Sequence, residues 1–208
     1  MTDSDILDRA KRHWRDLTSR LALPESAGDS LVAAYSEPHR RYHTLDHVVE
    51  MLDCLAGSRH LAANPDTVAL AAWYHDVVYA PDAPPAGNET ASAARLAADY
   101  AGAESAPAQA IILHSAHHGP SDDADTQLFC DLDLYRLGVG YDEFRVHSRA
   151  VRDEYSHVDD AAWALGRGDF FRGMLARDPL YQTAFWRARL EAQARDNLAR
   201  TIAALKQG

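Results

Sequence analysis

Apolar residues recur at three- and four-residue intervals along most of this chain, and no stretch alternates apolar and polar residues as a strand does. The first stripe consists of Ile6, Ala10, Trp14, Leu17 and Leu21. This spacing places them on one face of a helix that we expect to end before Pro24. A second helix is expected over about 30–36, before Pro38.

Capping residues predict the next two helices. Thr44 is a good N-cap for a helix that we expect Gly57 to end. Asn64 caps the following helix, with Pro65 at its first position. The helix that Asn64 caps leads directly into the sequence AAWYHDVVY. This run is apolar except for one adjacent polar pair, His75 and Asp76.

The rest of the chain is also expected to be helical. After a loop over 79–87, Asn88 is expected to cap a helix rich in alanine. Further helical segments are expected over 105–118 and 126–137, and in three stretches from 142 onward that break around Asp159 and Pro179. We therefore predict an all-α fold, an irregular helical bundle forming one domain over 1–208.

Composition excludes several classes of function. The 208 residues carry a formal charge of -10, which argues against a binder of nucleic-acid polymers or of membrane surfaces, because both need clustered Lys and Arg. No apolar run approaches a membrane span, and the N-terminus lacks a signal core, so we expect a cytoplasmic protein. Cys54 and Cys130 have no CxxC spacing and are expected to be buried thiols.

His75 and Asp76 are adjacent within the apolar run. An imidazole and a carboxylate taken out of water together cost several kcal/mol unless something pairs with them, and a divalent cation is a strong partner. A buried salt bridge or a hydrogen bond at a helix end is the alternative for either residue.

Histidines at helical spacing accompany this pair. His43 and His47 lie four residues apart at a helix start and share one face, although such a pair is also common on a solvated surface. His114, His117 and His118 repeat the pattern before Gly119. There the alternative is a helix end that favours cationic histidines through its dipole.

The ordered set of these motifs resembles the HD superfamily of metal-dependent phosphohydrolases. The resemblance is to a bacterial group of small predicted HD phosphohydrolases and extends over nearly the whole chain. The segments that carry it are RYHTLDHVVEML, AAWYHDVVY, NETASAARLA, DLDLYRLG, AVRDEYSHV, GRGDFFRGMLARDPLYQT and ARDNLARTIAAL.

The resemblance implies a set of metal ligands and an acid. His47, His75, Asp76 and an aspartate of the DLDL segment would hold the metal, with Asp133 preferred and Asp131 the alternative. Similarity of YHTLDH to a stretch of cyclic-nucleotide phosphodiesterases implies that His43 protonates the leaving oxygen. The cofactor would be one divalent ion or two, with Mn, Fe, Co, Ni, Zn and Mg all open.

Further residues are expected near the substrate. Glu89 resembles an acidic residue that lies near the site in similar proteins and would orient water or a ligand there. The alternative interpretation is that Glu89 is only a favourable charge in the first turn of a helix. His117 and His118 would face the pocket. Arg41 and Arg149 offer guanidinium groups that match phosphate oxygens, although each is as easily a surface residue.

These expectations amount to hydrolysis of a small phosphorylated substrate, with a divalent ion activating the attacking water. Three other classes stay open. One is a di-iron oxygenase of the same fold, the second is a non-catalytic metal- or nucleotide-binding module, and the third is a helical interaction protein with incidental histidines. The sequence specifies neither the substrate nor the oligomeric state.

Overall fold

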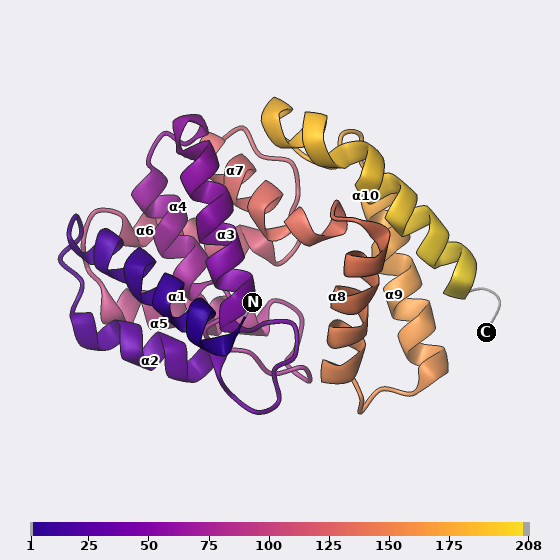
Figure 1. Ribbon diagram of the computed structural model, residues 1–208, viewed down its shortest axis with the longest axis horizontal. Helices are drawn as coiled ribbons and strands as arrows, with labels where there is room; N and C mark the ends of the chain where they lie inside the picture. The colour runs from indigo at the N-terminus through magenta and orange to yellow at the C-terminus, as the bar shows by residue number, and fades with distance from the viewer. Residues whose placement is uncertain (1, 206–208) are drawn as a thin grey trace. The chain divides into compact units, whose positions relative to one another are not determined.

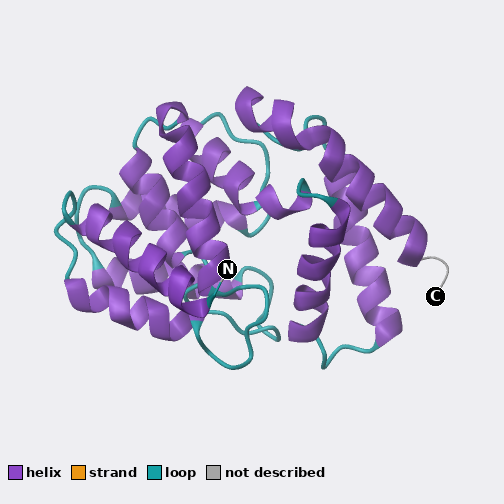
Figure 2. Ribbon diagram, viewed as in Figure 1, coloured by secondary structure: helices purple, strands orange, loops and turns teal. Residues whose placement is uncertain are grey.

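Helices make up the regular structure of this chain in a computed structural model that describes residues 2–205 (Figure 1). No strand occurs among the described residues, which confirms the predicted all-α class (Figure 2). The helices are α1 Asp3–Thr18, α2 Glu25–Tyr35, α3 Leu45–Ser58, α4 Pro65–Tyr74, α5 Gly87–Asp99, α6 Ser105–Ser115, α7 Ala124–Asp133, α8 Tyr141–Glu154, α9 Asp160–Leu175 and α10 Ala184–Leu205, with short 3-10 helices η1 Arg59–Leu61 and η2 Tyr135–Leu137.

The described chain divides into two compact units. The first contains residues 2–132 and the second contains residues 133–205. α7 belongs to the first unit except for its last residue, Asp133. The prediction of a single phosphohydrolase domain over the whole chain stays a prediction, and the two units are described in turn.

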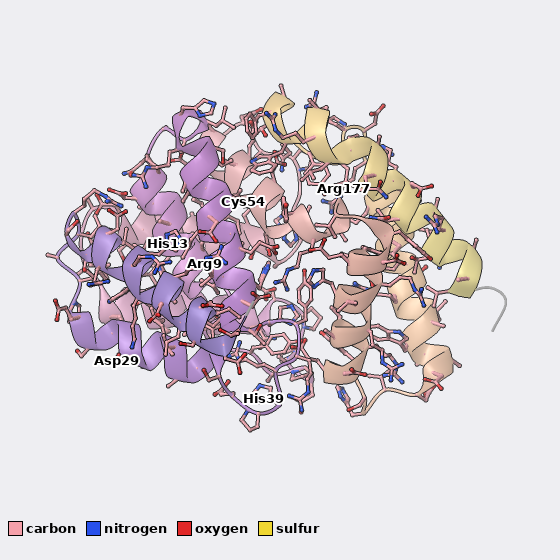
Figure 3. All side chains as sticks on the ribbon, viewed as in Figure 1. Arg9, His13, Asp29, His39, Cys54 and Arg177 are labelled. Atoms are coloured by element: carbon pink, nitrogen blue, oxygen red, sulfur yellow. The ribbon has the colours of Figure 1, made fainter. Side chains whose placement is uncertain are left out.

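α1 begins where the sequence allows reciprocal capping. The Thr2 hydroxyl accepts from the backbone N–H of Asp5, and the Asp5 carboxylate accepts from that of Thr2, so two N–H groups without helical partners are satisfied. Arg9 and His13, which are labelled on α1 in Figure 3, both contact the carboxylate of Asp53 in α3. α1 is thereby joined to α3 by ionic contacts as well as by its apolar stripe.

α4 is the central helix of the first unit. It packs against α1, α3, α5 and α6, and eight of its ten residues are buried. The side chain of Asn64 caps it as predicted, accepting from the N–H groups of Asp66 and Thr67. A helix enclosed on all sides is apolar all round, and for this reason its sequence shows no clear amphipathic face.

Several predicted boundaries are wrong. α2 begins at Glu25 and not near 30, and α6 ends at Ser115, before His117 and His118. Asn88 does not cap α5, because that helix already begins at Gly87. These errors fall where polar residues lie in a helix or where histidines follow one, positions at which hydrophobic spacing carries no information.

In the second unit α10 packs against α8, α9 and η2. The buried side-chain amide of Asn197 in α10 donates 2.8 Å hydrogen bonds to the backbone oxygens of Leu137 and Val139. Asp159 caps α9 by accepting from the N–H of Ala162. Polar side chains therefore hold the ends of this unit's helices in place.

Two predictions about the chain as a whole can be compared with the structure. No helix within residues 2–205 combines the length and apolarity needed to span a bilayer. Cys54 and Cys130 are both free thiols, and Cys130 is buried while Cys54 is half-buried.

Candidate metal centre

The histidine and aspartate of the central pair occupy a turn, because α4 ends at Tyr74. His75 is the C-cap, and its Nδ1 lies 3.0 Å from the backbone oxygen of Ala72. A carbonyl can only accept, so Nδ1 carries the proton and Nε2 points the other way, 2.9 Å from Oδ2 of Asp76. Only 2% of His75 is exposed.

This pair of contacts limits the state of the His75 ring. Because Nδ1 carries the proton, Nε2 of the neutral ring keeps a lone pair that can share a cation with Asp76, and the 2.9 Å contact lacks the geometry of a hydrogen bond. Two ligand atoms in neighbouring positions on one ion, each bonded at about 2.1 Å, lie roughly 3 Å apart. The observed separation of 2.9 Å therefore fits two ligand atoms of one ion.

His47 reaches the same place from α3. It is the third residue of that helix, 2% exposed, and its ring centroid lies 5.5 Å from that of His75 in an edge-to-face arrangement. The ring of Tyr42, on the segment before the helix, lies 5.4 Å from His47 on another side. His47 therefore faces the turn after α4 and is enclosed by protein.

Asp133, the last residue of α7, completes a group with these two histidines. One ligand atom from each of His47, His75 and Asp133 lies within 4.8 Å of the others. The neighbouring Asp131 is 1% exposed and does not belong to the group. Of the two aspartates that the sequence left open, the structure thus brings Asp133 to the histidines.

This group has the chemistry of a divalent-ion site. Two imidazoles and one carboxylate are a donor set that catalytic zinc and non-haem iron sites use, and three protein ligands leave a position for water or substrate. Asp76 stands beside His75 as a fourth donor. Separations of up to 4.8 Å exceed the roughly 3–4 Å of a loaded site, so the ligands would close slightly around an ion.

Arg40 holds the turn that carries His75 and Asp76. Its fully buried guanidinium donates to the backbone oxygens of Asp76 at 2.7 Å and of Val77 at 3.1 Å. It also donates to the backbone oxygen of His43 at 3.1 Å. One side chain therefore ties the segment before α3 to the segment after α4.

The same turn is held from α5. The hydroxyl of Ser92 bonds both the N–H and the carbonyl of Val78, and the side-chain amide of Asn88 does the same for Ala80. These four hydrogen bonds satisfy backbone groups that a loop leaves without partners. Asn88 thus closes a loop rather than capping a helix.

Two tyrosine hydroxyls fix the end of α4. Tyr35 donates from α2 to the backbone oxygen of Trp73 at 3.0 Å, and Tyr74 donates to the carboxylate of Asp99 at 3.2 Å. Burial, reinforced by the negative charge of Asp99, raises the pKa of the Tyr74 hydroxyl. Tyr74 is consequently a permanent donor, and the helix end that precedes His75 is rigidly placed.

His43, the predicted acid, lies outside the ligand group. Its ring stands 4.2 Å from the ring of Tyr79 and 4.9 Å from that of Tyr42, measured between centroids. Tyr42 in turn contacts the ring of His47. His43 is therefore one aromatic neighbour away from a candidate ligand and is half-buried.

The predicted arginines have other contacts. Arg41 is exposed and folds back on its own segment, donating to the backbone oxygens of Pro38 and Arg40. The side chain of Arg149 is 78% exposed and pairs with Asp153 one turn away on α8. Arg40, which the sequence did not single out, is the buried arginine of this segment. Two adjacent arginines give no sign of which one turns inward.

Glu89 and the histidines after α6 are not in the ligand group. Glu89 lies in the first turn of α5, where its negative charge is favourable, as its alternative interpretation expects. His114 contacts the backbone oxygen of Gly119 through Nε2, at 2.9 Å, and exposed His117 contacts that of His114. His118 adopts a left-handed backbone with φ 47°. The predicted helical stacking of His114 on His118 is therefore wrong, because α6 ends first.

Comparison with protein-family models, with curated proteins and with solved structures found no match for this chain.

Proposed function

We propose that this chain is a metal-dependent phosphohydrolase of the HD type. The observation that carries the proposal is the group of His47, His75 and Asp133, in which both histidines are buried and Asp133 is half-buried. Its members come from α3, from the turn after α4 and from the last residue of α7. Asp76 would join as the fourth ligand, since its carboxylate stands beside Nε2 of His75. A divalent ion bound there supplies an activated water at neutral pH and polarises a phosphoryl oxygen.

The chain's own residues would act around that chemistry. The bond from Nδ1 of His75 to Ala72 fixes the ring so that Nε2 faces the ligand group. His43, as an imidazolium, would donate its proton to the oxygen that leaves phosphorus. With a net charge of -10, the chain suits a small phosphorylated metabolite of the cytoplasm better than a nucleic-acid polymer.

Elemental analysis combined with a panel of phosphomonoesters and phosphodiesters tests the proposal. The wild type is expected to bind a divalent metal and to hydrolyse at least one ester. Alanine at His47 or Asp133 should remove metal and turnover together. Alanine at exposed His60 or Asp82 should change neither. Turnover that persists in fully metal-stripped protein would contradict the proposal.

The same donor set supports a second candidate. Two histidines and one carboxylate also bind Fe(II) in oxygenases. In that case the iron-loaded protein would consume dioxygen with an organic substrate and would hydrolyse none of the esters. Metal binding with neither activity would indicate a binding module.

A further inference from the structure

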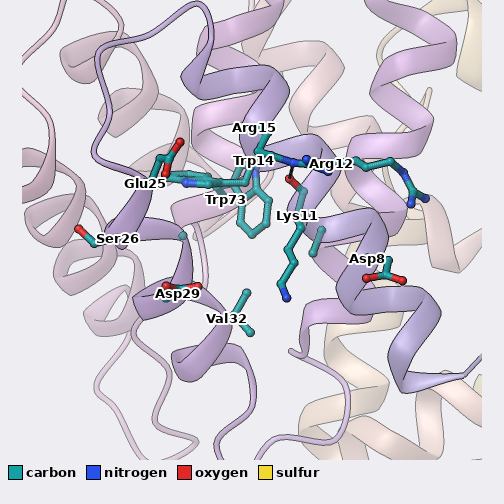
Figure 4. Close-up of a pocket in the computed structure, with 12 residues that line it drawn as sticks. Asp8, Lys11, Arg12, Trp14, Arg15, Glu25, Ser26, Asp29, Val32 and Trp73 are labelled. Carbon is teal, nitrogen blue, oxygen red and sulfur yellow. Dashed lines mark hydrogen bonds between the residues drawn. The ribbon is translucent and has the colours of Figure 1, made fainter.

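A separate cavity of about 660 Å³ opens between α1 and α2 (Figure 4). Residues of those two helices form its walls, and Trp73 of α4 lies at its base. Its volume is within the range of small-molecule sites in proteins. None of the candidate metal ligands lines it, so a function of this cavity is independent of the proposed function.

Two tryptophans at this cavity have polar groups without partners. Trp14 is 5% exposed and Trp73 is fully buried, and their rings meet edge to face with centroids 5.2 Å apart. Within residues 2–205, neither indole N–H has a hydrogen-bond acceptor. A buried donor left unsatisfied destabilises the fold, and native proteins contain few such donors. Both donors belong to residues that line one cavity, so an acceptor atom bound beside the indoles would satisfy a donor that is otherwise without a partner.

Gly28 determines which edge of Trp14 meets the cavity. A Cβ at position 28 would lie 2.5 Å from both Cδ1 and Nε1 of that indole. The N–H edge of Trp14 therefore lies directly against α2 at Gly28. Any side chain at residue 28 would displace the ring, so the glycine keeps the indole in this position.

Charges of opposite sign line the two walls. α1 contributes Lys11, Arg12 and Arg15, with Asp8 as the one acid, and α2 contributes Glu25 and Asp29. Figure 4 shows Lys11 and Asp29 on opposite sides of the opening. In the described part of the chain, neither of these two forms an ion pair. The mostly basic wall and the acidic wall are thus available to a ligand.

We infer that this cavity is a binding site for a small zwitterion with a flat apolar body, of the type of an aromatic α-amino acid. The apolar body would lie against Val32 and the indoles. The carboxylate would face the basic wall and accept from an indole N–H, and the ammonium group would face Asp29. Each polar feature of the cavity then has a counterpart in one compact molecule.

Indole N–H resonances of the full chain provide the test, because each tryptophan gives one signal and the chain has four. The probes are L-phenylalanine, phenylacetate and 2-phenylethylamine, which share the ring and differ in charge. L-Phenylalanine should shift the signals of Trp14 and Trp73 and leave those of Trp163 and Trp186 unchanged. A ligand of this size is expected to bind with a Kd of roughly 1 mM. The two singly charged probes should bind about tenfold more weakly.

Charge reversals at exposed positions make the test specific. Lys11→Glu and Asp29→Lys should each weaken L-phenylalanine binding about fivefold without changing the melting temperature. Asp82→Lys, on an exposed loop away from the cavity, is the matched control and should have no effect. Absence of any indole shift up to about 10 mM would overturn the site. Equal affinity for all three probes would overturn the zwitterion assignment.

Discussion

Nη1 of Arg40 donates a 2.7 Å hydrogen bond to the backbone oxygen of Asp76, so a residue before α3 holds the residue beside the candidate ligand His75. Further bonds to His43 and Val77, and the rings of Tyr35 and Tyr79 about the guanidinium, complete its environment. The turn after α4 is therefore held by one buried cation in addition to the hydrogen bonds from α5.

Replacing Arg40 by methionine should destabilise the protein by about 3 kcal/mol, because three carbonyls lose a charged donor and two of them belong to the turn after α4. Urea denaturation measures the loss. Arg41→Met is the matched control, since Arg41 is exposed and donates to backbone oxygens of its own segment, and it should cost less than about 0.5 kcal/mol. Equal costs at the two positions would refute the role given to Arg40.

Metal should stabilise the fold if the ligand group binds it. At a free Mn²⁺ concentration near 100 times Kd, stabilisation of about 2.7 kcal/mol corresponds to a rise in melting temperature of roughly 5–10 °C. The rise should disappear in His47→Ala and in Asp133→Ala and should remain in His60→Ala, whose side chain is exposed. An equal rise in all four proteins would place the metal elsewhere.

Gly138 gives a packing prediction for the second unit. A Cβ there would lie 2.6 Å from Cβ of Leu190 and 3.0 Å from the hydroxyl of Tyr181. Gly138→Ala should therefore cost about 1–3 kcal/mol. Gly166→Ala, in α9 with no atom within 4 Å of the added methyl, should instead stabilise by about 0.5–1 kcal/mol. Calorimetry of both variants checks the contrast.

Glu191 predicts an acid-sensitive segment. Burial alone would raise its pKa, but hydrogen bonds from the N–H groups of Tyr181 and Leu180 and from Arg195 outweigh burial and leave the pKa below its usual 4.5. A carboxyl with a lowered folded pKa stabilises above its unfolded pKa, and that stability is lost as pH falls through the folded value.

Stability should thus decrease below about pH 4.5, and Glu191→Gln should reduce the decrease. Urea denaturation at pH 7 and at pH 4 measures it. Glu143→Gln, at an exposed carboxyl on α8, is the control and should leave the pH dependence unchanged. An unaltered pH dependence in Glu191→Gln would contradict the assignment.

Local signals were sufficient for part of the fold. Asn64 and Asp159 mark helix starts because an amide or carboxylate capping a helix acts within a few residues. The same signal failed at Asn88, whose amide instead bonds Ala80 across a loop. Whether a polar side chain bonds its own helix or a distant segment depends on tertiary packing, which the sequence does not reveal.

The candidate site was predictable to a similar extent. The choice of His47, His75 and Asp133 came from resemblance, and the structure brings these three residues together. The inward turn of Arg40 could not be predicted, since it depends on carbonyls freed by the end of α4. The cavity between α1 and α2 also gave no signal, because its charged residues have the spacing of an ordinary solvated face.

The paired hydrogen bonds between Ala80 and Asn88 have a consequence for protein engineering. They join the two ends of the loop over 81–87 at its base, so the path of the chain inside the loop is decoupled from the turn that carries His75. Doubling the length of a flexible loop costs only about 0.6 kcal/mol in closure entropy. This loop is therefore the position at which a peptide tag or a grafted epitope can be inserted while the histidines keep their places.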